Sequence, residues 1–175
     1  FRNLMNDSYC RDISVKVRSN LEAKRRNGQF VGSKVVYGYM RSPENKNLLI
    51  IDPEAAAVVQ DIFRWKIDGQ SPAQIADRLN RNHIPSPIEY KKGKGSKQRT
   101  CFQTKEVAQW SAVAIYRILK NEIYIGTLVQ GKTTSPNHKV KKTVRKAPDE
   151  WVRTEHAHEA IIAPAQFDLV QRLML

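Results

Sequence analysis

The sequence predicts an α+β fold that is mainly helical, on three observations. Apolar residues recur with a helical period in five segments of the chain. Short β-prone runs beside turn residues occur before and after the central helical segments. Two lysine-rich stretches interrupt the pattern. We therefore expect a long N-terminal connecting helix, a β-hairpin, a three-helix core like a helix-turn-helix with a basic insertion, a small β element and a C-terminal helix.

The first segment predicts a helix that ends at Asn27-Gly28, a good helix stop. Ile13, Val17 and Leu21 recur at four-residue spacing and form one narrow apolar stripe. Such a stripe on a basic helix indicates a connecting or subunit-associating helix, although a surface helix of the same domain is the plainer alternative. We place a domain boundary after it, which divides the chain into residues 1–28 and 29–175.

A β-hairpin is predicted next, from two β-prone runs, Val35–Met40 and Leu48–Ile51, with turn residues between them. Asp52-Pro53 then gives a helix start signal, a capping residue followed by proline. Apolar residues with a 3.6-residue period continue to Ile67, which is typical of a core helix.

Three short helices, at about 53–68, 71–82 and 111–120, can form the core of a helix-turn-helix domain. Ser71-Pro72 repeats the start signal, and Ser111 is a suitable cap for the third helix. The usual motif joins its second and third helices by a turn of about 3–4 residues. Here residues 84–109 stand between them, so we expect a basic insertion in this motif.

Both lysine-rich stretches are predicted to be loops that become ordered on a partner. The first lies between Ile84 and Gln109 and the second between Lys132 and Lys146. Around the second loop we expect strands at 124–129 and 150–155, with residues 160–162 beside the latter. A last helix is expected from Pro164, with Phe167, Val170 and Leu173 on its apolar face.

The charge balance points to a polyanionic partner. The chain has 30 Lys+Arg against 17 Asp+Glu, a formal net charge of +13 and a pI of about 9.9. Nucleic acid is the commonest partner of such a field, and a solvated basic surface is the alternative. The candidate DNA-contacting residues are the clustered cations and the side chains that the third helix leaves outside its apolar stripe: Lys24, Arg25, Arg26, Lys34, Lys91, Lys92, Lys94, Lys97, Arg99, Ser111, Tyr116, Arg117, Lys120, Lys141, Lys142 and Arg145.

We find no sequence pattern that nominates a nucleophile, a general base or a cofactor site, so we expect no active site and no cofactor. His156 and His158 alternate as on a strand, but no third ligand accompanies them, and we expect no metal. Cys10 and Cys101 form no CxxC pair, and two reduced cysteines in a cytosolic protein are expected. No apolar run approaches the roughly 18 residues of a membrane span.

Five stretches together carry a family resemblance: RDISVKVRSNLEAKRRNGQFVG, VYGYMR, IDPEAAAVVQDIFRWKIDGQSPAQIADRLNRNHIPSP, WSAVAIYRILKNEIYIGTLVQGK and IIAPAQFDLVQRL. In order and spacing they resemble the recombinase domain of large serine recombinases, the integrases and transposases of phages and conjugative elements. The resemblance covers nearly the whole chain. It departs at Val35-Val36 and at Glu122, where such proteins often carry proline.

The resemblance implies a division of labour. The parent protein would be a DNA strand-exchange enzyme that cuts by serine attack, with its catalytic domain before Phe1 and a zinc ribbon after Leu175. This fragment would bind double-stranded DNA in the bacterial cytoplasm and recognise the crossover-proximal part of an attachment half-site during integration or excision. The third helix would enter the major groove, the stretch after Arg26 would cross toward the minor groove, and the first helix would help subunits associate as dimers or tetramers. A helix-turn-helix transcriptional regulator and a non-specific DNA- or RNA-binding module are the alternatives.

Overall fold

The computed structural model describes residues 2–96, 106–135 and 142–175 of the chain. These residues form six α-helices and three two-stranded antiparallel sheets, which confirms the mainly helical α+β prediction. The chain divides into two compact units: residues 1–51 with 122–160, and residues 52–121 with 161–175. The domain boundary predicted after residue 28 stays a prediction.

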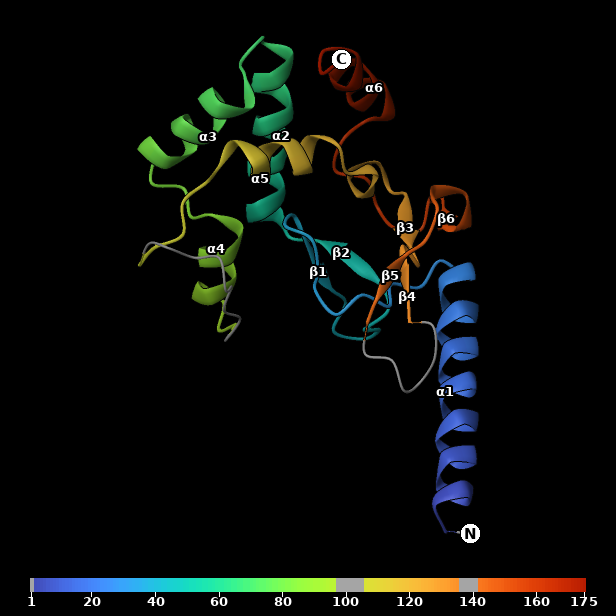
Figure 1. The fold of residues 1–175 in the computed structure, drawn as a ribbon. Coiled ribbons are helices and arrows are strands. Elements are labelled where there is room, and N and C mark those ends of the chain that lie inside the picture. The colour runs from blue at the N-terminus through green and yellow to red at the C-terminus, as the bar shows by residue number, and fades with distance from the viewer. Residues whose placement is uncertain (1, 97–105, 136–141) are drawn as a thin grey trace. The chain divides into compact units, whose positions relative to one another are not determined.

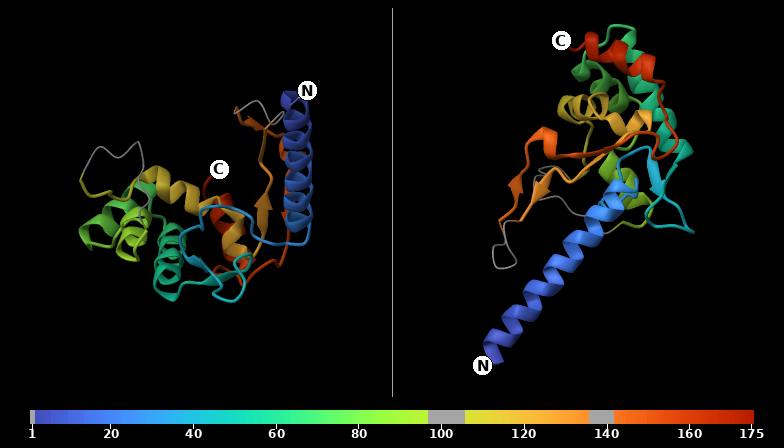
Figure 2. Two further views of the ribbon diagram at one scale, coloured as in Figure 1. Left: turned by 90° about the horizontal axis from the view of Figure 1, so that it is seen from below. Right: turned by 90° about the vertical axis from the view of Figure 1, so that its right-hand side faces the viewer.

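In the first unit, α1 (Arg2–Arg26) is one helix without a break (Figure 2, blue). It ends as predicted because Gly28 adopts a left-handed conformation with φ of 68°, which a residue with a side chain adopts only with strain. A Cβ at Gly28 would also lie 3.0 Å from the Thr154 side chain. The predicted apolar stripe is solvent-exposed in this chain, where Ile13 is 43% and Val17 is 52% exposed.

The stretch after α1 is tied to the β-hairpin, which is shorter than predicted. β1 (Tyr39–Arg41) pairs with β2 (Leu49–Ile51) in antiparallel register. The Phe30 amide donates to the Asn47 carbonyl at 2.7 Å, and the Phe30 ring is buried. Residues 35–38 are not in the ladder because the chain turns at Gly38, where φ is 97°.

The strand predicted at 124–129 begins later. Residues Glu122–Ile125 form a 3₁₀ turn, η1, and β3 (Leu128–Gln130) pairs with β6 (Val152–Thr154). Tyr124 is fully buried in η1, and its hydroxyl donates to the Tyr37 carbonyl at 2.9 Å. Residues 160–162 do not form the strand expected beside β6, whose one partner strand among the described residues is β3.

His156 and His158 do not share a strand face as expected, because both lie in the turn that follows β6. His156 is exposed and has a φ of 52°. Half-buried His158 has its Nε2 2.7 Å from the Ile123 carbonyl, and its ring meets the Tyr39 ring edge-on at 4.8 Å. Burial lowers the pKa of His158.

The second basic stretch contains a short hairpin of β4 (Thr133–Thr134) and β5 (Val144–Arg145). Strands of two residues carry no readable period, which is why the sequence predicted only a loop. Next to this hairpin, the Trp151 indole donates a hydrogen bond to the carbonyl of Lys146, the residue after β5, at 3.1 Å. The short turn η2 (Pro148–Glu150) precedes this tryptophan.

The second unit is helical, with α2 (Pro53–Ile67), α3 (Pro72–Arg81), α4 (Pro87–Gly93), α5 (Ala112–Leu119) and α6 (Pro164–Arg172) (Figure 1). Helices α2, α3 and α5 pack on one another and confirm the predicted three-helix core. The largest fully buried side chains of this unit are Val59, Ile62, Phe63, Ile75, Leu79, Ile115, Leu119 and, from α6, Val170. Helix α6 adds Phe167 against Phe63, at 6.1 Å between ring centroids.

Helix α4 corrects the prediction that residues 84–109 are irregular. Ser86-Pro87 is another cap-and-proline start, and seven residues then form a helix. Lys97 and Arg99 lie outside the described residues. No helix within the described ranges is both long and apolar enough to cross a lipid bilayer.

Candidate nucleic-acid interface

The helix pair α3 and α5 is held in place although about thirty residues of chain separate the two helices. The Asn80 side chain accepts from the Trp110 amide at 2.9 Å and donates to the Trp110 carbonyl at 3.0 Å. The Trp110 indole is buried and donates to the Ile84 carbonyl at 3.0 Å. Because Ser111 and α5 follow directly, these bonds fix the start of α5 against the end of α3.

Local capping sets where both helices begin. Ser71 and Gln74 form a capping box, in which each side chain accepts from the other residue's backbone N–H. Ser111 accepts from the Ala114 amide at 3.2 Å. The Ser111 hydroxyl, predicted to contact DNA, therefore already stabilises the first turn of α5.

The outer face of α5 combines cationic and apolar side chains. Val113, Tyr116, Arg117 and Lys120 are exposed and follow one another at helical spacing, opposite the buried Ile115, Ile118 and Leu119. The Lys120 ammonium lies 5.9 Å from the Tyr116 ring centroid. Arg117 has no ion-pair partner among the residues whose positions are defined. We call these four residues the outer face of α5.

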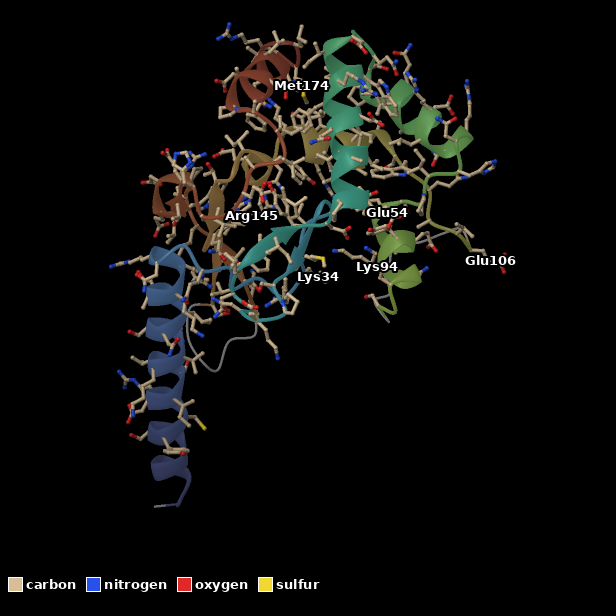
Figure 3. All side chains as sticks on the ribbon, turned by 180° about the vertical axis from the view of Figure 1, so that it is seen from behind. Lys34, Glu54, Lys94, Glu106, Arg145 and Met174 are labelled. Atoms are coloured by element: carbon tan, nitrogen blue, oxygen red, sulfur yellow. The ribbon has the colours of Figure 1, made fainter. Side chains whose placement is uncertain are left out.

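In the insertion, Lys94 is engaged within the protein. Its ammonium lies 3.0 Å from the carboxylate of Asp52, a buried residue at the start of α2, and 3.9 Å from Glu54. Lys94 and Glu54 lie close together in Figure 3. The Tyr90 hydroxyl lies within 3.0 Å of both carboxylates. The pKa of Lys94 is raised, mainly by its hydrogen bond with the Tyr90 hydroxyl and next by its hydrogen bond with the Asp52 carboxylate.

A second internal pair holds Lys92. Its ammonium donates to Glu89 at 2.8 Å, and the same carboxylate accepts from the Ala108 amide at 3.1 Å. These two hydrogen bonds lower the pKa of Glu89. The Ser86 hydroxyl also donates to the Ala108 carbonyl at 2.7 Å. The two ends of the insertion are thereby linked, and Lys92 and its neighbour Lys91 lie half-buried on α4.

The cations at the end of α1 differ in their surroundings. Arg26 forms an ion pair with Glu22 at 2.6 Å. Arg25 lies half-buried, its Nε is buried with no hydrogen-bond partner among the described atoms, and its carbonyl accepts from Thr154. Lys24 is half-buried, while Lys34 is exposed.

The stretch that follows Arg26, expected to cross toward a minor groove, is fixed to the first unit. The Gln130 side chain accepts from the Val31 amide at 3.0 Å and donates to the Gln29 carbonyl at 2.8 Å. Arg41 donates to the Gly32 carbonyl, and its guanidinium lies over the Phe30 ring.

At the β4–β5 hairpin, Lys142 and Arg145 are exposed, and Lys141 lies outside the described residues. Lys132 lies 5.0 Å over the Trp151 ring. An exposed pair of cations on a narrow hairpin suits contact with phosphates.

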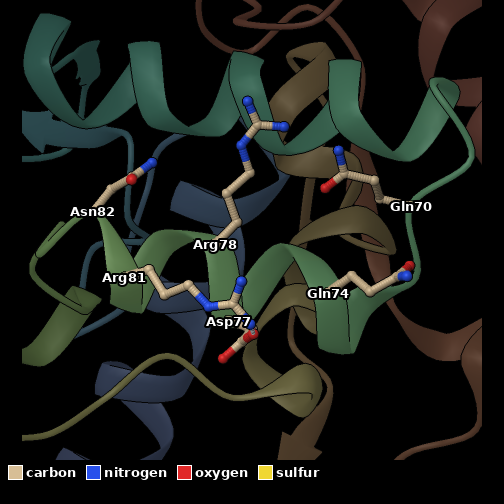
Figure 4. Close-up of a pocket in the computed structure, with 6 residues that line it drawn as sticks. All are labelled: Gln70, Gln74, Asp77, Arg78, Arg81 and Asn82. Atoms are coloured by element: carbon tan, nitrogen blue, oxygen red, sulfur yellow. Dashed lines mark hydrogen bonds and ion pairs between the residues drawn. The ribbon is translucent and has the colours of Figure 1, made fainter.

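A hollow lies along α3 and is lined by Gln70, Gln74, Asp77, Arg78, Arg81 and Asn82 (Figure 4). Arg78 stacks on the Trp65 ring at 4.2 Å, and Arg81 pairs with Asp77. Both arginines of the hollow are therefore engaged within this unit, and none of its six residues is a nucleophile paired with a base. Across the part of the chain with defined placement, no group of three or more His, Cys, Asp or Glu could hold a metal ion.

Sequence reasoning missed three features of this region. It missed the carboxylates of Asp52 and Glu54 beside Lys94, which no local pattern reveals because about forty residues separate them. It missed the link between Asn80 and Trp110, for the same reason. It also passed over Val113, although its spacing from Arg117 on one helix was readable.

The three-helix core with its α3–α5 pair is typical of a helix-turn-helix DNA-binding domain, and comparison with known families identifies which family it belongs to. The family model for Recombinase matches residues 53–175, more than half of the chain. The chain belongs to the Recombinase family. The resemblance to a recombinase domain stated from the sequence is thereby confirmed for residues 53–175.

One solved structure with a TM-score above 0.5 has this fold. The chain is similar to a protein in the structure "Crystal Structure of a LSR-DNA Complex", where LSR denotes a large serine recombinase, with 19% identity and a TM-score of 0.52 over 91% of this chain and 37% of that chain. A second similar structure, on the attP site of a Listeria innocua prophage, has 20% identity and a TM-score of 0.49 over 87% of this chain and 48% of that chain. The chain spans less than half the length of each matched protein.

Proposed function

We propose that this chain is the duplex DNA-binding domain of a large serine recombinase and recognises the crossover-proximal part of an attachment half-site. The observation that carries the proposal is the outer face of α5, which presents Arg117 and Lys120 from a helix fixed against α3. Membership of the Recombinase family supports it, as does the likeness to a protein whose structure is described as a complex with DNA.

The geometry suits a major groove. That groove is about 12 Å wide and admits an α-helix, and an eight-residue helix such as α5 is about 12 Å long. An arginine that reaches base edges pairs with guanine O6 and N7 through two hydrogen bonds. We assign that role to Arg117, and phosphate contact to Lys120.

Contacts with phosphates would supply affinity without reading sequence. We assign them to the exposed cations Lys34, Lys142 and Arg145. Lys94, by contrast, is assigned a structural role, because Asp52 and Glu54 already neutralise it. Arg25 is also assigned a structural role, because its side chain is partly enclosed within the first unit.

The proposal extends to the longer protein that would contain this chain. That protein would exchange DNA strands by serine attack during integration or excision, with this domain selecting the site. Helix α1 would join recognition to catalysis. Its exposed stripe, with Ile13 and Val17, would contribute to association between subunits.

The test is a selection of duplex DNA by this chain from a random pool. We expect recovery of a motif of about half a recombination site, bound at least about 10³-fold more tightly than random duplex. Recovery of no motif, with equal affinity for RNA, would replace the proposal by non-specific polyanion binding.

A further inference from the structure

Val113 is an exposed apolar residue on the face of α5 that we propose contacts DNA. It lies in the first turn of α5 and is 58% exposed. Single exposed valines are common on protein surfaces. Val113, however, shares a continuous face with Tyr116, itself 49% exposed, and precedes Arg117 by one helical turn.

The chemistry of the major groove narrows what such a side chain can contact. Base edges there present hydrogen-bond donors, acceptors and one apolar group, the C5-methyl of thymine. The N-terminal residues of a helix-turn-helix recognition helix are the ones that contact base edges. A valine in the first turn has no donor or acceptor to offer, so the thymine methyl is its complementary partner.

The spacing sets a register. Val113 and Arg117 are four residues apart, or about 6 Å along the helix axis. Successive base pairs are about 3.4 Å apart along duplex DNA. Contacts by these two residues therefore fall within two base pairs of each other.

We propose that Val113 is a specificity-determining residue that contacts the C5-methyl of a thymine, within two base pairs of the guanine that Arg117 contacts. This inference rests on the proposed function and deepens it. Two observations support the inference. Val113 lies on the outer face of α5 with Arg117, and it is exposed although the opposite face of the helix is buried.

The test replaces each thymine of the selected duplex, one at a time, by deoxyuridine, which deletes only the methyl group. We expect one position at which this replacement lowers the affinity of the unaltered protein about fourfold, as for one buried methyl group. Val113→Ala should lower affinity by a similar factor on the thymine duplex, and the deoxyuridine at that position should then have no further effect.

Val107→Ala is the matched control, because Val107 is 63% exposed in the same unit and does not belong to α5. It should preserve the full deoxyuridine effect. If a motif is selected but no deoxyuridine weakens binding, or Val113→Ala keeps the whole effect, the inference is wrong and the proposed function stands. If no motif is selected at all, the proposed function and this inference fail together.

Discussion

The side-chain amide of Asn80 binds both backbone groups of Trp110, accepting from its N–H at 2.9 Å and donating to its carbonyl at 3.0 Å. This pair of hydrogen bonds holds the start of α5 beside the end of α3, as the short turn does in an ordinary helix-turn-helix motif. The chain can leave α3, form an insertion of about thirty residues and return to the same place. Helices α3 and α5 therefore pack directly on each other although the insertion separates them in sequence.

Asn80→Ala should lower the free energy of unfolding by about 1–3 kcal/mol. The substitution removes two hydrogen bonds and leaves the Trp110 backbone groups without their partner. Urea unfolding measures the change. Asn82→Ala is the matched control, since Asn82 is exposed at the end of α3, and its effect should stay within about 0.5 kcal/mol. Equal losses in both variants would contradict the role of Asn80.

Lys94→Ala should leave the salt dependence of DNA binding unchanged. The Lys94 ammonium is held by Asp52, so its removal takes away no phosphate contact. The sequence alone predicted the opposite, because it grouped Lys94 with the flexible cations of the insertion. Fluorescence anisotropy at several salt concentrations measures the slope of log K against log[salt].

The comparison variant for that slope replaces both exposed hairpin cations, Lys142→Ala with Arg145→Ala. If each contacts one phosphate, the slope should become shallower by about 1.8, or about 0.9 for each contact. A shallower slope for Lys94→Ala and an unchanged one for the hairpin variant would reverse our assignment of the two regions.

Stability should depend on pH through His158. Burial lowers its pKa in the folded state, while the unfolded chain keeps the ordinary value of 6.5. Below pH 6.5 the unfolded state therefore binds more protons, so stability is complete above this pH and falls as the pH drops toward the folded-state pKa. The cause is burial of the ring, which disfavours its charged form by more than the hydrogen bond with the Ile123 carbonyl favours it.

His158→Gln should flatten that pH dependence, because glutamine can still donate to the Ile123 carbonyl but does not titrate. Thermal unfolding at several pH values below 6.5 measures it. His156→Asn serves as the control in the same turn, since His156 is exposed and asparagine tolerates its positive φ. An unaltered pH profile in His158→Gln would show that other groups control acid sensitivity.

Much of the fold was predictable because local signals agree with it. Asp52-Pro53, Ser71-Pro72 and Ser111 each mark a helix start, and the structure places α2, α3 and α5 directly after them. The exposure of Tyr116, Arg117 and Lys120 followed from the period of the buried residues between them.

The rest depends on contacts between distant segments. β3 is shorter than the strand expected from composition. The bounds of a three-residue strand depend on the strand it pairs with, here β6, and not on its own sequence alone. Lys94 was predicted to be available to DNA because residues 90–100 include no acidic residue, yet the fold brings Asp52 to it. Helix α4, by contrast, had a local start signal that was not used, Ser86-Pro87.

The most direct test of sequence recognition by α5 compares Arg117→Ala with the unaltered protein on the selected duplex and on a scrambled one. Arg172→Ala, an exposed arginine outside the proposed interface, is the charge-matched control. Anisotropy titrations should show that Arg117→Ala loses about 1–3 kcal/mol of discrimination between the two duplexes, while Arg172→Ala keeps it. Equal losses of affinity on both duplexes in Arg117→Ala would mean that α5 does not read the sequence.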